Sequence, residues 1–381
     1  MKPVLPLLLF ILIPVSGCIE RFYPDIKDYE NMLVVEGSIT QEHKPYQFYL
    51  SHSFPFDDYR AEKESGAIVE IEDNDGNKFP CHEKKKGLYE SSPDEFTGRA
   101  GKSYRLHITT RDGLHYASDW VTMRSTPEID SVFYEYREGD LRADYTRLQG
   151  IQIYVNTHDP SNKTFYYRWR YTETWEFHVP YTSLVKPNAD VCWRTDSSRN
   201  IYIASTIGLS SNLLQRQPVV FIDNSSNRLA IAYSILIRQY SLNDQGYQFY
   251  KTLVENNQAT GTLFDTPPSQ AAGNIYCTTD NRIPVFGFFD ASEVKTYRLS
   301  VKRENLPGSF YTTNGYDFCR LVEIPEQDKE QLNSYYRQGY QYYLRYFNSQ
   351  LDKWMVILVS EANCIDCTID GTNVKPSFWP Y

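Results

Sequence analysis

Apolar and polar residues alternate along much of the chain with the period of two that is typical of β-strands. The segment from Gly66 to Phe79 is a clear case, because the alternation runs until an Asp-Gly pair at 75–76 interrupts it. A second Asp-Gly pair at 112–113 follows another such run, and this dipeptide favours tight hairpin turns. Regularly spaced strands with almost no helical period predict an all-β sandwich over residues 30–123.

A second β-rich region is predicted over residues 124–381, after a break at "MRSTPEID". Its longest strand candidates are "TFYYRWRYTETWEF" and "LAIAYSILIRQYSL". In the latter, the inward-facing set is expected to be Ile231, Tyr233, Ile235 and Ile237. A capping box from Ser241 to Asp244 predicts a helix over 242–256, and Pro325 is expected to start a second short helix. With a closing strand in "KWMVILVS", the sequence predicts a mainly β fold with one or two short helices.

The first 17 residues have the form of a secretory leader. Lys2 precedes an apolar run from Pro3 to Val15, which is too short to span a membrane as a helix. The next residues, Ser16-Gly17-Cys18, complete a match to the bacterial lipobox, so Cys18 is expected to carry a lipid anchor, with residues 18–29 as a tether. The alternative is an ordinary leader followed by a chance cysteine.

Composition excludes one class of partner. The formal charge is -9, and loss of Lys2 with the leader makes it -10, while the only basic run is Lys84-Lys85-Lys86. Nucleic-acid binding needs a basic surface, so it is not expected. The 32 tyrosines favour sheet packing, and a tyrosine-rich surface that binds sugars or peptides is the second interpretation. We expect Trp169, Trp175 and Trp193 to pack in the core, and ligand contact is the alternative for each.

Three motifs resemble ligand sites but fail on a required position. "GRAGKS" has Phe96 in place of the first phosphate-loop glycine, and "HEKKK" has Lys86 in place of the second zinc-binding histidine. "DNDGN" resembles a calcium loop, but Lys84 occupies the place of the bidentate acid, so a hairpin turn is expected. We therefore expect neither a metal nor another cofactor. No Gly-x-Ser-x-Gly sequence is present, although a triad assembled in space from the seven histidines stays open.

The "CIDC" stretch near the end of the chain has the spacing of a redox pair or half a zinc site. The residues after it include a glycine and two prolines, so the helix of a thioredoxin-like site is not expected, and zinc would need a second pair. In an exported chain the six cysteines other than Cys18 suggest disulfides, with 15 full pairings.

We expect the two cysteines of this stretch to bond to distant cysteines and to hold a tail in which Phe378 and Trp379 are buried. Cys81 and Cys277 are expected to stay free. The disulfide candidates are Cys192, Cys319, Cys364 and Cys367.

Several strings, in their order, carry a family resemblance: "MLVVEGSIT", "GKSYRLHITTRDGLHYASDWVTM", "YSILIRQYSLNDQGYQFYKTL", "GTLFDTPPSQAAGNIY" and "CIDCTIDGTNVKPSFW". Over nearly the whole mature chain the sequence resembles the Bacteroidota lipoprotein family catalogued as domain of unknown function 4249. The pattern that begins "GAIVEIEDNDG" also resembles small immunoglobulin-like or prealbumin-like modules. Such modules serve many functions, so the fold resemblance implies little about activity.

The family resemblance implies a location more than a chemistry. It implies an outer-membrane lipoprotein that acts beside a TonB-dependent transporter as an accessory that captures or gates an unidentified nutrient. Because the sequence contains no complete catalytic motif and its β architecture is rich in tyrosine, we expect a non-enzymatic binding component. An adhesin or structural envelope lipoprotein is the alternative hypothesis. A hydrolase with a site assembled in space is the third hypothesis. Surface display in that phylum is favoured by an early acidic run, whereas here Glu20 is followed by Arg21, so both membrane faces stay open.

Overall fold

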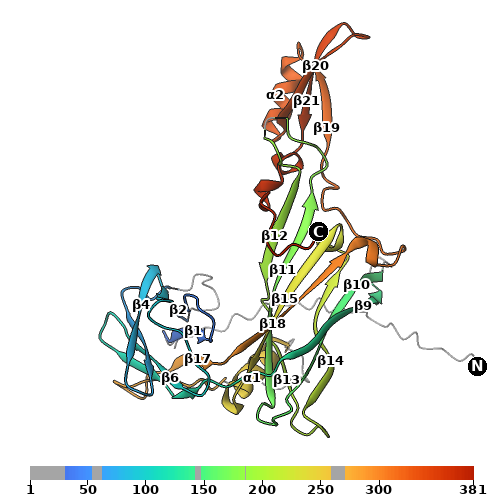
Figure 1. The fold of residues 1–381 in the computed structure, drawn as a ribbon. Coiled ribbons are helices and arrows are strands. Elements are labelled where there is room, and N and C mark those ends of the chain that lie inside the picture. The colour runs from blue at the N-terminus through green and yellow to red at the C-terminus, as the bar shows by residue number, and fades with distance from the viewer. Residues whose placement is uncertain (1–30, 54–61, 142–146, 185, 259–270) are drawn as a thin grey trace, which may run out of the picture.

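The computed structural model describes residues 31–53, 62–141, 147–184, 186–258 and 271–381, and it is mainly β, as predicted. The leader, the tether and Cys18 lie outside the described residues. Figure 1 shows three bodies: a curled sheet on one side, a two-layer sandwich in the middle, and a small module that projects from the far end of the sandwich.

The curled sheet contains the strands predicted for residues 30–123 and two that come from much later in the chain. Its order is β16-β7-β6-β3-β4-β5-β2-β1-β17, with β8 paired to β6. The bounds are β1 Leu33–Ile39, β2 Gln47–His52, β3 Ile68–Asp73, β4 Lys78–Lys85, β5 Leu88–Ser91, β6 Ser103–Thr109, β7 His115–Ser118, β8 Val121–Thr122, β16 Ile275–Cys277 and β17 Val285–Ala291. Both Asp-Gly pairs connect hairpins, as expected. In the first, the Asp73 carboxylate accepts hydrogen bonds from the N–H groups of Asp75 and Asn77, so "DNDGN" is a turn.

The two edges of the curled sheet meet through Asn274. Its side-chain amide donates to the carbonyl of Phe289 at 2.9 Å and accepts from the N–H of Phe289 at 2.8 Å. The sheet therefore curls round its own buried core, whereas the sequence pattern favoured a two-sheet sandwich. Strand alternation identifies the buried face of each strand but does not say whether the strands form one sheet or two.

The sandwich packs the sheet β14-β10-β9 against the sheet β12-β11-β15-β18, in which β13 also pairs with β11. The bounds are β9 Ile129–Leu141, β10 Arg147–His158, β11 Tyr166–His178, β12 Val191–Ser197, β13 Tyr202–Ser205, β14 Leu213–Asp223, β15 Ala232–Ser241 and β18 Val294–Lys302. Of the predicted inward set, Tyr233, Ile235 and Ile237 are buried in the core, while Ile231 precedes the strand and is half-buried.

Helix α1, Asp244–Gln258, follows β15 and confirms the predicted helix. The Asn243 side chain accepts the N–H of Gly246, and the Ser241 hydroxyl instead bonds to the carbonyl of Ser125, so the expected Ser241 cap was wrong. Among the described residues, no helix is both long enough and apolar enough to cross a membrane. The short 3₁₀ segments are η1 Asn227–Leu229, η2 Arg303–Asn305, η3 Ala362–Cys364 and η4 Cys367–Ile369.

The C-terminal module contains the sheet β19-β21-β20 and helix α2. Its bounds are β19 Leu321–Pro325, α2 Lys329–Arg337, β20 Gln341–Asn348 and β21 Lys353–Val359. Pro325 ends β19 and does not start the helix; Asp328 caps α2 by accepting the N–H of Gln331. The predicted closing strand is confirmed as β21.

One segment belongs to two bodies. β17 pairs in parallel with β1 of the curled sheet, and after two residues β18 pairs antiparallel with β15 of the sandwich. The connection is buried: the N–H of Ser241 donates to the hydroxyls of Thr126 and Ser292 at 3.1 and 3.0 Å. Backbone pairing on both sides thus fixes the curled sheet against the sandwich.

The first prediction concerns Gly287 in β17. Its φ is +150°, and a Cβ there would lie 2.2 Å from the carbonyl oxygen of Val35 in β1. We expect Gly287→Ala to lower the free energy of unfolding by about 1–3 kcal/mol, because the backbones of β17 and β1 must move apart. Urea denaturation measures the change. Gly308→Ala, where a Cβ meets nothing within 4 Å, is the control and should be nearly neutral; equal losses in both variants would contradict the argument.

Candidate functional site

The candidate site is a cleft of about 790 Å³ between the curled sheet, α1 and the sandwich. β1, β2 and β17 form one wall, β11 and β15 the other, and α1 contributes residues at the junction. The size is that of a small-molecule site. Its aromatic lining includes Tyr49, Tyr240, Phe249, Tyr250, Phe286 and Phe288.

Arg168 occupies the junction of these elements because of the alternation along β11. Its neighbours Tyr167 and Trp169 point into the sandwich core, so Arg168 lies on the opposite face, which the cleft borders. Only 7% of the residue is exposed. The guanidinium carbon lies 4.4 Å from the ring centroid of Tyr250 and 5.1 Å from that of Tyr240, so two tyrosine faces enclose the cation.

The charge of Arg168 has no direct counter-ion among the residues the structure describes. No carboxylate oxygen of these residues lies within 4.0 Å of it, and its Nε has no hydrogen-bond partner there. Burying an unpaired cation is unfavourable unless the surroundings compensate. The two tyrosine rings compensate part of this cost.

Asp290, the next-to-last residue of β17, acts electrostatically on Arg168 without contacting it directly. Burial raises the pKa of Asp290, and the positive charges of Arg168 and Arg124 oppose that rise. Burial lowers the pKa of Arg168, but Tyr250, Asp290 and Tyr240 outweigh it, and the pKa of Arg168 is raised overall. The junction thus contains a stably charged arginine and a carboxyl group that resists ionisation.

A second cleft, of about 670 Å³, lies where residues 122–130 meet 158–164. His158 and Asp130 form an exposed pair there, with Nδ1 2.8 Å from the carboxylate.

The other histidines were compared with the geometry of a catalytic triad. His52 and His178 also contact carboxylates, and His115 contacts the Thr109 hydroxyl. No histidine of the described part contacts both a carboxylate and a hydroxyl, so these residues form no triad of the kind left open above. The described residues also contain no group of three metal-binding side chains.

The three tryptophans considered as ligand contacts are buried, which confirms the core-packing expectation. Trp169 is fully buried, and its indole N–H donates to Gln239 at 2.9 Å. Trp175 and Trp193 are also buried. Neither Arg168 nor Arg170 was predicted from the sequence as a ligand contact. The signal was present in "YRWRY", where arginines alternate with aromatic residues on a predicted strand.

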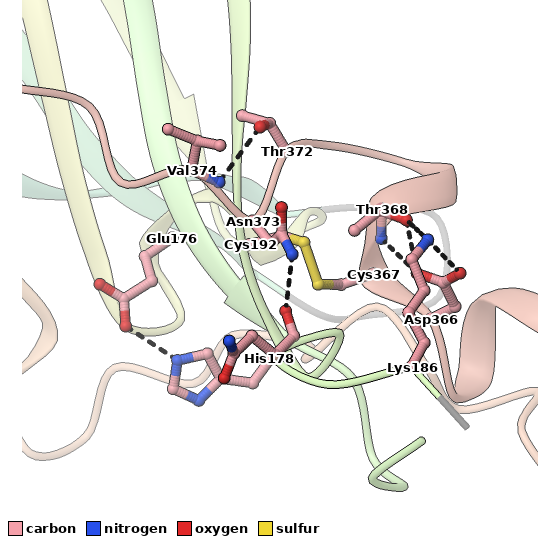
Figure 2. Close-up of a disulfide and its surroundings, with 11 residues drawn as sticks. Glu176, His178, Lys186, Cys192, Asp366, Cys367, Thr368, Thr372, Asn373 and Val374 are labelled. Atoms are coloured by element: carbon pink, nitrogen blue, oxygen red, sulfur yellow. Dashed lines mark hydrogen bonds and ion pairs between the residues drawn. A yellow bond between two sulfur atoms is a disulfide. The ribbon is translucent and has the colours of Figure 1, made fainter. Parts of the chain in front are cut away.

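The four disulfide candidates pair as Cys192–Cys367 and Cys319–Cys364, which confirms that each cysteine of the "CIDC" stretch bonds to a distant partner. Cys81 and Cys277 are free and buried. Figure 2 shows Lys186 directed at Asp366 and Thr368 beside the first disulfide, with Nζ 2.8 Å from the Asp366 carboxylate.

The C-terminal tail, residues 371–381, lies against the sandwich. Thr372 exchanges backbone hydrogen bonds with Trp193 of β12, and the Trp379 indole donates to Glu176. Trp379 is buried, as expected, but Phe378 is 40% exposed, so the expectation for Phe378 was wrong. Its ring lies 3.7 Å from the guanidinium carbon of Arg298, on the outer face of the sheet.

The fold and the cleft define a β-rich protein in which a curled sheet and a sandwich enclose a ligand-sized space. The chain belongs to the family described as a domain of unknown function (DUF4249), whose model matches residues 19–298. This match ends within β18, whereas the resemblance noted above extends to the C-terminal strings. No curated protein matches the chain.

A second prediction concerns the buried residues Arg168 and Asp290. Because the pKa of Asp290 is raised in the folded protein, stability falls as the pH rises from the ordinary aspartate pKa through the folded one. Arg168→Met removes the opposing cation, so we expect a loss of about 1–3 kcal/mol near neutral pH and a smaller loss at mildly acidic pH.

Urea denaturation at the two pH values measures this effect. The double variant Arg168→Met/Asp290→Asn should recover part of the stability near neutral pH. Arg170→Met, at an exposed position on the same strand face, should not lower the free energy of unfolding at either pH, because it removes a like charge opposite Arg238. A loss that is the same at both pH values would contradict the electrostatic argument.

A third prediction concerns the crosslinks. The double variant Cys192→Ala/Cys367→Ala should lose about 5 kcal/mol in the chain-entropy model, because the bond joins residues 175 positions apart. We expect thermolysin to cleave the tail of this variant at once, as read by intact-mass spectrometry. Cys81→Ala, which removes a free thiol, should keep the tail protected; protection in both proteins would show that the disulfide does not hold the tail.

Proposed function

We propose that the protein is an outer-membrane lipoprotein that binds a nutrient molecule, without converting it, as an accessory of a TonB-dependent transporter. The observation that carries the binding role is the cleft of about 790 Å³ between the curled sheet and the sandwich. The lipobox ending at Cys18 and the family resemblance support the membrane location and the transporter partner.

The shape of the cleft supports capture by a preformed site. Its two walls belong to bodies joined by the backbone of residues 285–302, so little ordering has to occur on binding. Its aromatic lining supplies apolar contact area, and its arginines supply fixed hydrogen-bond donors. These are the attributes of a site that recognises a ligand.

A second candidate function, as an adhesin or structural envelope lipoprotein, is favoured by the C-terminal module. Phe347 and Trp354 are 47% and 46% exposed at the end of the β20–β21 hairpin, and their rings pack edge to face at 5.4 Å. Arg345 lies over Trp354 at 4.1 Å. Exposed aromatic residues of this kind are common in protein contacts.

The test of the transporter role is purification of the lipidated protein from membranes after chemical crosslinking. We expect a TonB-dependent transporter to be recovered with the wild-type chain. Cys18→Ala should release the protein from the membrane fraction and abolish labelling by fatty acid, because the lipidated sulfur is absent. Recovery of no transporter with the membrane-bound wild type would contradict the proposal.

Deletion of the gene separates the two candidates. Accessory function predicts a loss of nutrient uptake with unchanged surface attachment. Adhesin function predicts the reverse, and Trp354→Ala should then reproduce the defect in attachment because it removes an exposed ring of the hairpin.

A further inference from the structure

The outer face of the sheet that contains β11 and β15 carries an unusual arrangement of arginines. Arg170 in β11 and Arg238 in β15 are paired directly opposite each other. Arg168 lies two residues from Arg170 on the same face, and Arg298 in β18 pairs with Leu236, two residues from Arg238. Like charges placed directly across a strand pair destabilise a sheet. A bound anion would therefore offset the repulsion between the arginines of this face.

The protein supplies little negative charge to this face. Glu42 approaches Arg238 at 4.0 Å, but it is already bound by Lys44. Arg170 forms no ion pair with any described residue, and Arg298 contacts the Phe378 ring and the Ser234 hydroxyl. Burial and the neighbouring Arg238 both lower the pKa of Arg298.

The cleft extends this excess of positive charge. The cleft is lined by four basic and two acidic residues, although the whole chain has a net charge of -9. They are Lys44, Arg168, Arg170 and Arg199 against Glu36 and Glu90. A basic cleft in an acidic protein favours anions locally, in particular where aromatic walls reduce solvent screening.

Arg168, which also lines the cleft, provides an independent observation. It is more than nine-tenths buried, it lines the cleft, and its Nε has no partner among the described residues. A buried donor without a partner is costly, and Tyr240, Tyr250 and Asp290 act on the charge of Arg168 without bonding this N–H, so an anionic oxygen near Arg168 and Arg170 would be favourable.

We propose that the cleft binds a small organic anion through its carboxylate groups, with Arg170 as the accessible guanidinium and Arg168 as the buried charge behind it. The inference rests on the proposed binding function and names its ligand class. The planar fork of Arg170 matches a carboxylate with two parallel hydrogen bonds. The carbon skeleton of the ligand lies against aromatic residues of the cleft such as Tyr49 and Tyr250.

The experiment is isothermal titration of the purified protein with citrate and with glutarate as carboxylate probes. We expect both to bind, and we expect affinity to fall as the salt concentration rises, because exposed charges are screened. Arg170→Gln should weaken binding by about tenfold or more, and Arg170→Lys by less, since it keeps the charge but loses the fork. Arg111→Gln, an exposed arginine outside the cleft, should change affinity less than about twofold.

The failure of this inference is distinguishable from the failure of the proposed function. If neither probe binds to the folded wild-type protein, or if Arg170→Gln binds as tightly as wild type, the anion assignment is overturned. Recovery of a transporter from membranes would still support the accessory role in that case. Circular dichroism of each variant verifies that a loss of binding is not a loss of folding.

Discussion

The structure depends on one stretch of backbone that belongs to two sheets. Residues 285–291 pair with β1 of the curled sheet, and residues 294–302 pair with β15 of the sandwich. Only Ser292 and Glu293 separate the two strands, and the hydroxyls of Thr126 and Ser292 satisfy the adjacent backbone. Hinge motion at these two residues would break the hydrogen bonds that Ser241 and Thr126 donate to them. The cleft between them is therefore held open in a fixed shape.

This rigidity explains how a charged residue comes to be buried beside the cleft. Arg168 is carried by a central strand of the sandwich, while Tyr250 of α1 and Asp290 of β17 in the curled sheet act on it from outside that sheet, so the chain cannot easily move it to solvent. Tyrosines suit this place because each ring offers a face to the cation and a hydroxyl to water or to a neighbour. Part of the chain's high tyrosine content is thus explained by a polar junction as well as by sheet packing.

Local patterns predicted the elements whose causes are local. The Asp-Gly hairpins, β15 and α1 follow from short-range periodicity and turn chemistry, and the two crosslinks followed from the cysteine count and compartment. The closing of the curled sheet was not predictable, because it depends on Asn274 and Gly287, which lie far along the chain from β1. The cleft was missed for the same reason. The alternation around Arg168 shows which face of β11 it occupies, but nothing nearby in the sequence shows what covers that face.

The two disulfides relate the C-terminal module to the cleft. Cys319 and Cys364 lie where the chain enters and leaves the module, so their bond closes it into a loop around a core of four buried residues. Such a small core gains from a crosslink. Cys192–Cys367 then fixes the end of that loop to β12, next to the last residues of β11. Arg168 lies near the other end of β11, and a strand of its length spans about 40 Å. The cleft and the attachment of the C-terminal module therefore lie near opposite ends of β11, so a ligand in the cleft would not obstruct a partner at the module.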